Sequence, residues 1–293
     1  MMYSVSERKN YIKNVQLPYR HKRLFGSSHG WLAIVDKISR AITLMNPFAQ
    51  AMAPIHLPHL NEDVSKVILS ADPALNPNSY MVIAIYNSIH LAFLKGGQED
   101  WNCIRLDSLH HPLTDVIFYK SQIYAVSIHG TIVSINVNMC VINSSHPPEL
   151  LDVRAFMTRI RDLDQAYLVE STKGHLWHVQ RCSIGVTQFD GNVLFEEGFR
   201  VYKVVFSDTD GCMVKHVEVK TIGDEALFIG KNYSVSVSAS KFPGCQPNSI
   251  YYTGGSKEFV MRIFDVEFGT ACAVIEGRKP RGLWITPPFK GLG

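Results

Sequence analysis

The segment with the clearest catalytic spacing is Gly26-Ser27-Ser28-His29-Gly30, which fits the G-x-S-x-G pattern of a nucleophile elbow. In an elbow the central serine, here Ser28, lies on a strained turn between a parallel strand and a helix, where it attacks a carbonyl carbon. The surroundings do not fit, because Pro18 interrupts the basic stretch before the motif and residues 31–35 after it are typical of a strand. The sequence therefore predicts a structural turn at Ser28 and no catalytic nucleophile.

Histidines are the next candidates, because imidazole nitrogens can ligate metals or transfer protons. His56 and His59 have H-x-x-H spacing, and His110 and His111 are adjacent. A helix would bring two such ligands to one face, but a proline lies beside each pair and opposes a helix. These histidines are therefore predicted to lie in loops without a metal ion.

Carboxylates and cysteines give no stronger indication of a catalytic, metal or redox site. Glu196 and Glu197 are adjacent, so on a strand their side chains would face opposite sides. No C-x-x-C pair and no phosphate-binding glycine loop occurs, and we expect buried free thiols at all six cysteines: Cys103, Cys140, Cys182, Cys212, Cys245 and Cys272. We predict no catalytic residues, no cofactor and no metal, so the protein is not expected to be an enzyme.

The composition is that of a folded, water-soluble protein. The chain has 293 residues, of which 46% are hydrophobic and 19% charged, and this suffices for one large domain or two ordinary ones. No apolar run approaches the ~18 residues that a membrane helix needs. The N-terminus soon becomes charged and lacks a secretion signal. We therefore expect a cytoplasmic or nuclear protein with no membrane partner, an organelle being the alternative.

The positive charge is concentrated at the N-terminus. Residues 1–25 hold six lysines and arginines against one acidic residue, whereas the remaining chain has 23 basic and 25 acidic residues. Such an arm can bind nucleic acid, but no basic groove with interleaved aromatic residues follows it. We interpret residues 1–19 as a solvated basic arm and do not expect nucleic acid as a partner.

Short strands in hairpins dominate the rest of the chain. From Tyr233 to Ser240 apolar residues alternate with serines, the period of a strand with one buried face. Six hairpins are predicted where apolar runs flank turn residues: 31–35 with 41–45, 80–86 with 90–95, 122–126 with 131–137, 165–170 with 175–181, 199–206 with 213–219, and 249–253 with 260–265. Residues 150–160 fit either a helix or a strand, and the strand suits the repeat better.

The spacing of these hairpins favours a β-propeller. The middle pairs begin at Tyr80, Gln122 and Gln165, intervals of 42 and 43 residues, close to the ~40–50 residues of a four-stranded blade. A β-sandwich would close after fewer strands. We therefore predict an all-β fold with one propeller over residues 20–290, of six blades, with five or seven as alternatives. The ring is expected to close by pairing of strands from opposite ends of the chain.

Aromatic residues recur in or beside the predicted strands. Most are expected to pack between neighbouring blades, although some could instead surround a carbohydrate or peptide site on one face. They are Trp31, Tyr86, Trp101, Tyr124, Tyr167, Trp177, Tyr202, Phe228, Tyr251 and Trp284.

Several stretches along the chain share their order with one known family. They are residues 26–32, 46–48, 55–58, 115–119, 124–126, 167–171, 223–230, 233–245, 249–253 and 284–287. In this order they resemble the plant F-box-associated β-propeller family of the KIB type, and the resemblance covers nearly the whole chain.

Members of that family typically carry an N-terminal F-box, a short helical module that docks on a Skp-type adaptor of a cullin ubiquitin ligase. Their propeller is held to select the protein to be ubiquitinated, so the resemblance implies a propeller that binds an unidentified protein client. Only 25 residues precede Gly26, so we expect this chain to lack an F-box and not to bind a Skp-type adaptor. The alternatives are a free-standing binding propeller unconnected to ubiquitination and a carbohydrate-active propeller enzyme.

Overall fold

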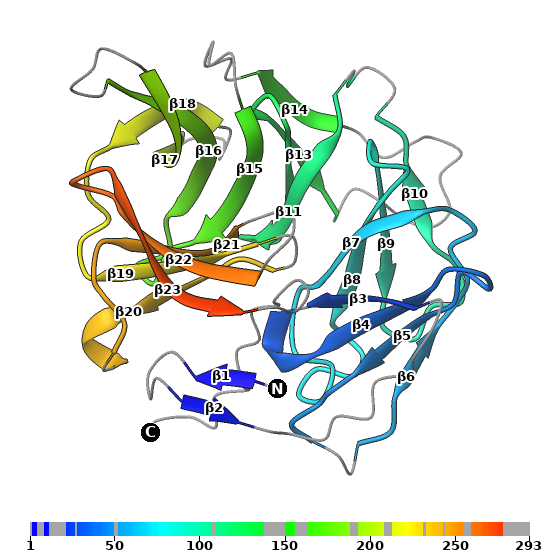
Figure 1. The fold of residues 1–293 in the computed structure, drawn as a ribbon. Coiled ribbons are helices and arrows are strands. Elements are labelled where there is room, and N and C mark those ends of the chain that lie inside the picture. The colour runs from blue at the N-terminus through cyan, green and yellow to red at the C-terminus, as the bar shows by residue number, and fades with distance from the viewer. Residues whose placement is uncertain are drawn as a thin grey trace.

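The structure is a computed structural model that describes residues 2–4, 9–11, 22–26, 28–49, 52–106, 109, 111–137, 150–155, 163–187, 193–207, 213–230, 233–242, 244–254 and 259–277. These residues form 23 strands and two 3-10 turns. Within them no helix is long and apolar enough to span a membrane. Five sheets surround a common axis as the blades of one β-propeller (Figure 1). The all-β propeller is therefore confirmed.

Blades 1 to 4 each consist of four antiparallel strands in chain order. Blade 1 contains β3 (Lys22–Gly26), β4 (Leu32–Asp36), β5 (Ile42–Met45) and β6 (Ile55–Leu57), and blade 2 contains β7 (Val64–Leu69), β8 (Met81–Tyr86), β9 (His90–Lys95) and β10 (Asn102–Ile104). Blade 3 contains β11 (Leu113–Tyr119), β12 (Gln122–Ser127), β13 (Thr131–Asn136) and β14 (Leu150–Ala155), and blade 4 contains β15 (Leu163–Glu170), β16 (Leu176–Thr187), β17 (Val193–Phe206) and β18 (Met213–Val219).

Blade 5 has a different topology. Its strands are β19 (Glu225–Ile229), β20 (Val235–Ser238), β21 (Ser249–Gly254), β22 (Phe259–Asp265) and β23 (Thr270–Gly277), in the order β20-β19-β21-β22-β23. β19 pairs antiparallel with β20 and parallel with β21. A parallel pair needs a crossover, and residues 239–248, which include the 3-10 turn η2 (Ala239–Lys241), provide it.

All six predicted hairpins are present. Residues 150–155 form strand β14, so strand is the correct choice there, and residues 156–160 lie outside the described part. The structure has five blades, one of the two alternatives to the predicted six. Their first strands begin at residues 22, 64, 113, 163 and 225, so the later blades are longer than the predicted period of 42 or 43 residues. The predicted boundaries at residues 20 and 290 lie outside the described residues.

Each of the five blades consists of strands that are consecutive in the chain. The expected closure by strands from opposite ends of the chain concerns terminal residues that lie largely outside the described part, so it stays a prediction. Within residues 1–19, interpreted as a solvated arm, β1 (Met2–Ser4) and β2 (Lys9–Tyr11) form a two-stranded ribbon. Of the cysteines, Cys182 is buried as expected, but Cys103 and Cys272 are exposed.

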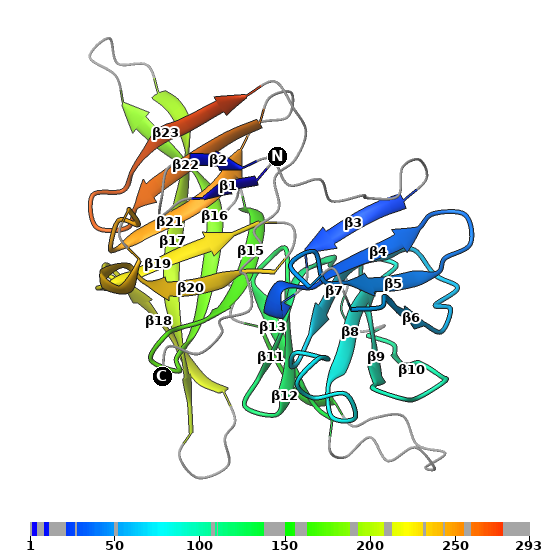
Figure 2. The same ribbon diagram turned by 90° about the horizontal axis from the view of Figure 1, so that it is seen from below.

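The turns of the blades define two faces of the ring. The turn between the first and second strands of each of blades 1 to 4 lies on one side of the ring, which we call the first-turn face. There the Tyr119 hydroxyl at the end of β11 donates to the Gly174 carbonyl in the β15–β16 turn at 2.7 Å. The turn between the second and third strands of each of these blades lies on the other side, which we call the second-turn face. There Leu113 N donates to the Ser88 carbonyl in the β8–β9 turn at 2.6 Å. There β16 and β17 remain paired as far as Thr187 and form a projecting ribbon (Figure 2).

Apolar side chains fill the spaces between adjacent blades. The inner strands β3, β7, β11, β15 and β20 contact one another in that order. Of the ten aromatic residues, most of which were expected to pack here, eight are buried. Trp31, Tyr86, Tyr124, Tyr167 and Trp177 lie between blades, whereas Phe228 and Tyr251 pack within blade 5 and Tyr202 stacks on His216 within blade 4. Trp101 is half-buried, and Trp284 lies outside the described residues.

A buried ion pair connects the inner strands. Lys66 on β7 pairs with Asp115 on β11, and each side chain is only 2% exposed. The same carboxylate accepts a hydrogen bond from Leu168 N on β15 at 3.0 Å and one from the Ser234 hydroxyl, just before β20, at 3.4 Å. Burial raises the pKa of Asp115, and Lys66 opposes that shift. One carboxylate therefore joins the inner parts of blades 2 to 5.

On the first-turn face, two indole groups each donate to a carboxylate of the next blade. Trp31 Nε1 donates to Asp72 at 2.8 Å, and Trp177 Nε1 donates to Glu225 at 2.7 Å. Glu225 also accepts from the backbone N of Thr172 at 2.8 Å and from its hydroxyl at 2.6 Å. Burial alone would raise the pKa of Glu225, but the hydrogen bonds from Thr172 and Trp177 outweigh it and lower the pKa.

Replacing Lys66 by Met should destabilise the protein by about 3–5 kcal/mol, because it leaves the buried carboxylate of Asp115 without a counter-charge. The double variant Lys66→Met, Asp115→Asn removes both charges and should recover much of that loss. The free energy of unfolding in urea measures both effects. A single Lys66→Met variant as stable as the native protein would contradict the proposed role of the pair.

Acid should weaken the contribution of Glu225 to stability. Because the pKa of this carboxyl is lowered in the folded protein, its contribution is present above the ordinary pKa and is lost as pH falls through the folded value. Glu225→Gln should be less stable than the native protein at neutral pH, and the difference should narrow as pH falls below the ordinary glutamate pKa of about 4.3. Urea unfolding across these pH values, with the exposed Glu267→Gln as control, tests this; a constant difference would contradict it.

Candidate interaction surface

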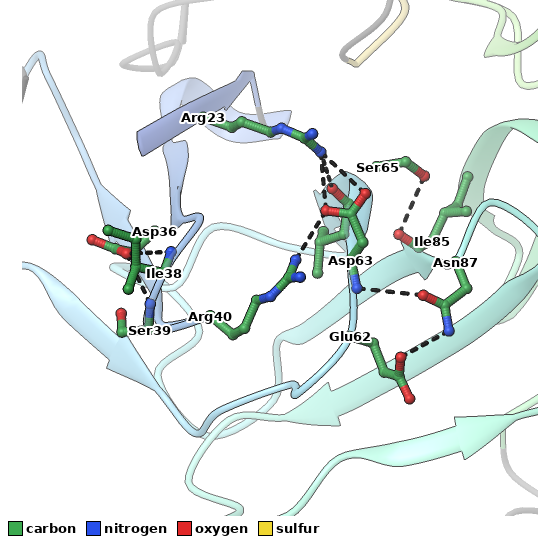
Figure 3. A network of polar contacts seen from close by, with 11 residues as sticks. Arg23, Asp36, Ile38, Ser39, Arg40, Glu62, Asp63, Ser65, Ile85 and Asn87 are labelled. Atoms are coloured by element: carbon green, nitrogen blue, oxygen red, sulfur yellow. Dashed lines mark hydrogen bonds and ion pairs between the residues drawn. The ribbon is translucent and has the colours of Figure 1, made fainter. Parts of the chain in front are cut away.

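Where blade 1 meets blade 2 on the second-turn face, two arginines share one carboxylate (Figure 3). Asp63 immediately precedes β7, Arg23 lies on β3, and Arg40 follows the β4–β5 turn. Arg23 Nη1 lies 3.1 Å from Asp63 Oδ1 and 3.4 Å from Oδ2, and Arg40 Nη1 lies 3.0 Å from Oδ1. Two guanidinium groups from blade 1 are therefore held on the first strand of blade 2.

The β4–β5 turn fixes the position of Arg40. Asp36 Oδ1 accepts hydrogen bonds from Ile38 N at 2.9 Å and Ser39 N at 3.0 Å, and Arg40 N donates to the Asp36 carbonyl at 3.0 Å. These backbone N–H groups, Ser39 first, lower the pKa of Asp36. Arg40 adopts a φ of 60°, the left-handed conformation that closes the turn. A local ring of hydrogen bonds thus directs the guanidinium toward Asp63.

A second set of bonds holds Asp63 itself. Asn87, in the β8–β9 turn, donates from its backbone N to the Asp63 carbonyl at 2.9 Å and accepts from Asp63 N at 3.4 Å. Its side-chain amide donates to Glu62 at 2.8 Å, as Figure 3 shows. The backbone on both sides of the shared carboxylate is therefore fixed by the neighbouring turn of blade 2.

These ion pairs contribute little to the stability of the fold. The side chains of Arg23, Arg40 and Asp63 are 44%, 37% and 55% exposed, and pairs this exposed typically stabilise a protein by about 0.2–1 kcal/mol each. Their main physical effect is to restrict the rotamers of two long cationic side chains. A partner that binds here meets arginines already ordered, which reduces the entropy lost on binding.

An exposed apolar side chain lies beside this network. Ile38 is 75% exposed, two residues before Arg40 in the same turn. One exposed apolar residue is ordinary, but arginine is enriched in protein interfaces, where apolar contact and desolvated arginines supply much of the binding energy. We define the 1–2 surface as Ile38, Arg23, Arg40, Glu62 and Asp63. Its chemistry suits contact with another protein.

Ser28 has a structural role in the interface between blades 1 and 2. It begins the 3-10 turn η1 (Ser28–Gly30), which connects β3 to β4 within one antiparallel pair, so the predicted turn is confirmed. Its hydroxyl donates to the Leu69 carbonyl at 2.6 Å and accepts from Leu69 N at 3.1 Å. The side chain is 1% exposed. Both of these bonds hold β7 of blade 2 against the turn.

The histidines singled out by spacing do not form a ligand cluster. His56 lies on β6, not in the predicted loop, and its Nδ1 is 3.3 Å from the Thr43 hydroxyl. His59 does lie in a loop, with Nδ1 2.9 Å from the Ser39 carbonyl. His111 packs edge-on against His129, and His110 lies outside the described residues. Among the residues described, no three His, Cys, Asp or Glu side chains gather closely enough to bind a metal.

Sequence reasoning missed the 1–2 surface. Glu197, which it did consider, pairs with Arg181 in blade 4 instead. Arg23, Arg40 and Asp63 are ordinary surface charges in the sequence, and only the ring brings residues 40 positions apart together. One signal was present, since the predicted hairpin of residues 31–35 with 41–45 places Ile38 and Arg40 in its turn, and such a turn exposes its central residues.

Comparison with known proteins shows relatives among plant F-box proteins. The family described as KIB1-4 beta-propeller matches residues 2–273. Three Arabidopsis thaliana relatives are F-box protein At2g17690 (33% identity over 39% of this chain and 26% of that protein), F-box protein At2g26160 (25%, 86% and 82%) and F-box protein At4g35733 (26%, 69% and 52%). The chain spans less than two thirds of the length of the first and the third.

Replacing Ser28 by Ala should destabilise the protein by about 1–3 kcal/mol, because it leaves the buried Leu69 N–H without its acceptor. The exposed Ser39→Ala is the matched control and should change the free energy of unfolding by less than about 0.5 kcal/mol. Urea unfolding measures both. Covalent labelling of Ser28 by a fluorophosphonate probe would show instead that the hydroxyl is an accessible nucleophile.

Proposed function

The chain belongs to the KIB1-4 β-propeller family, and from that membership we propose that it is a protein-binding propeller that recognises a client protein. The family match extends over residues 2–273, and the three relatives are F-box proteins. In F-box members of the family, the corresponding propeller is held to be the part of a ubiquitin-ligase receptor that selects a client. The proposed role is binding and requires no catalytic residue.

The observation that carries the proposal to specific residues is the arginine pair on Asp63. Arg23 and Arg40 are held by one carboxylate at 3.1 and 3.0 Å, yet all three side chains remain open to solvent. Ile38, two residues before Arg40 in the same turn, has 75% of its surface exposed. Ordered cations near an exposed apolar side chain support recognition of a protein surface that offers carboxylates near an apolar patch.

Delivery of the client to a ligase is the finer part of the proposal. An F-box docks on its adaptor through helices, whereas the described part of residues 1–293 contains strands and two 3-10 turns. We therefore expect the propeller formed by the described residues to bind a client without binding a Skp-type adaptor directly. A role outside ubiquitination would use the same client surface.

Ile38→Asp should abolish most client capture, because it replaces the apolar contact by a charge that repels an acidic client. The matched control is Leu75→Asp on the first-turn face, since Leu75 is 79% exposed and Ile38 75%. Tagged native and variant proteins are incubated with plant extract, and proteins enriched by the native chain are quantified by mass spectrometry. Proteins lost with Ile38→Asp and kept with Leu75→Asp are the clients.

Two results would contradict this proposal. If no protein is enriched by the native chain, or if Leu75→Asp removes the same proteins as Ile38→Asp, the 1–2 surface is not the client site. Adaptor binding is tested separately by mixing purified residues 1–293 with a recombinant Skp-type adaptor. Direct co-purification of these two would show that ligase docking resides in this chain.

A further inference from the structure

A second arginine–carboxylate cluster lies between blades 4 and 5. Arg181 on β16 and Glu197 on β17 come from blade 4, whereas Tyr252 on β21 and Arg262 on β22 come from blade 5. In the β15–β16 ladder Arg181 lies opposite Gln165, near the start of β15. This is the end of the blade at which the second turn lies. The cluster therefore belongs to the second-turn face, like the 1–2 surface.

The cluster has more positive charge than its own carboxylate can satisfy. Arg181 Nη2 forms an ion pair with Glu197 Oε1, but Arg262 Nη1 lies 3.8 Å from Glu197 Oε2, beyond hydrogen-bond distance. Two guanidinium groups and one carboxylate leave a net charge of +1. In the 1–2 surface, by contrast, both arginines are hydrogen-bonded to Asp63.

Four polar atoms of this cluster are buried without a hydrogen bond of good geometry, although Tyr252 lies close enough to Arg262 for the guanidinium to oppose the rise in its pKa. They are the donors Arg181 Nε, Arg262 Nε and the Tyr252 hydroxyl and the acceptor Glu197 Oε2, four of the seven buried side-chain atoms in the described part of the chain that lack a hydrogen-bond partner. Most buried polar groups have a partner, so such a concentration in one place needs an explanation. A group that accepts hydrogen bonds and carries negative charge would give the three donors, though not Glu197 Oε2, a partner.

The cluster between blades 4 and 5 is partly open to solvent, and its tyrosine hydroxyls stay protonated. The side chains of Arg181, Glu197 and Arg262 are 17%, 31% and 39% exposed, so a small group can reach the solvent-facing parts of the guanidinium groups, whereas Arg181 Nε, Arg262 Nε and the Tyr252 hydroxyl are themselves buried. Burial raises the pKa of Tyr252, and it raises the pKa of neighbouring Tyr167 to about 12. Both hydroxyls therefore remain neutral donors at physiological pH.

We propose that Arg181, Arg262 and Tyr252 bind an oxyanion, a carboxylate or phosphoryl group carried by a client side chain. Guanidinium forks match the geometry of both groups, and an anion would accept hydrogen bonds from the solvent-facing N–H groups of Arg181 and Arg262 and, with a small shift of side chains, from the buried donors. Glu197 occupies one side of Arg181 and competes with the anion for it. The claim that a client carries the oxyanion rests on the proposed function. The claim that these residues bind an oxyanion does not.

Inorganic phosphate is the probe for the site itself. Isothermal titration calorimetry of purified residues 1–293 at constant chloride should show binding, and Arg262→Gln or Tyr252→Phe should weaken it about tenfold or more, the equivalent of one charge-assisted hydrogen bond. Arg105→Gln is the matched control, an exposed arginine outside both clusters, and should leave the Kd unchanged. Equal weakening by all three variants, or no binding by the native protein, would overturn the inference.

Glu197→Gln separates an anion site from a structural ion pair. If Glu197 competes with the anion, the variant should bind phosphate several-fold more tightly even where it lowers Tm. If the cluster is only an inter-blade ion pair, Tm falls with no gain in affinity and the inference is wrong. Because Arg262 is partly exposed and Tyr252→Phe keeps the ring, a folded variant is expected for each, as circular dichroism can verify.

The source of the anion is tested with short peptides that differ only in carrying serine, aspartate or phosphoserine at one position. Displacement of phosphate by the aspartate or phosphoserine peptide, but not by the serine peptide, identifies the carboxylate or the phosphoryl group as the ligand. If free phosphate binds and no peptide displaces it, a client-borne ligand is wrong. Loss of client capture in the Ile38→Asp experiment is independent of all these outcomes.

Discussion

The ion pair between Lys66 and Asp115 is the contact on which the rest of the ring depends. Taking two charges out of water costs several kcal/mol per ion, and the cost is offset only when every lone pair and proton has a partner. Asp115 meets this condition with Lys66, Leu168 N and Ser234, which come from three other blades. Because the carboxylate is satisfied only when all four blades are in place, it couples their positions.

The two faces of the ring use carboxylates in opposite ways. On the first-turn face Glu225 is 1% exposed and saturated by donors such as Trp177, so its charge locks one blade to the next. On the second-turn face Asp63 and Glu197 are partly exposed and are outnumbered by arginines. Glu225 thus uses its charge to join two blades, whereas Asp63 and Glu197 hold arginines that remain partly open to solvent.

The sequence predicted the strands better than their grouping into blades. Alternating apolar residues and turn chemistry act over a few residues, which is why all six hairpins were identified. The 42- and 43-residue period was partly coincidental, since Tyr80 and Gln122 mark second strands whereas Gln165 lies in the first strand of blade 4. Long segments after β13 and in β16–β17 hid the true blade lengths, and no local pattern announces a parallel pair such as β19 and β21.

The arginine clusters could not have been predicted from local sequence for the same reason. Arg181 and Arg262 are 81 positions apart, and each occupies a strand position where a solvated charge would be unremarkable; the propeller brings them together at a blade junction. A charge at such a junction is partly desolvated, so its pairing matters far more than that of a charge on an open strand. Asp63 satisfies both of its arginines and Glu197 satisfies only one. The junction between blades 4 and 5, although less exposed, therefore has the greater unmet capacity to bind an anion.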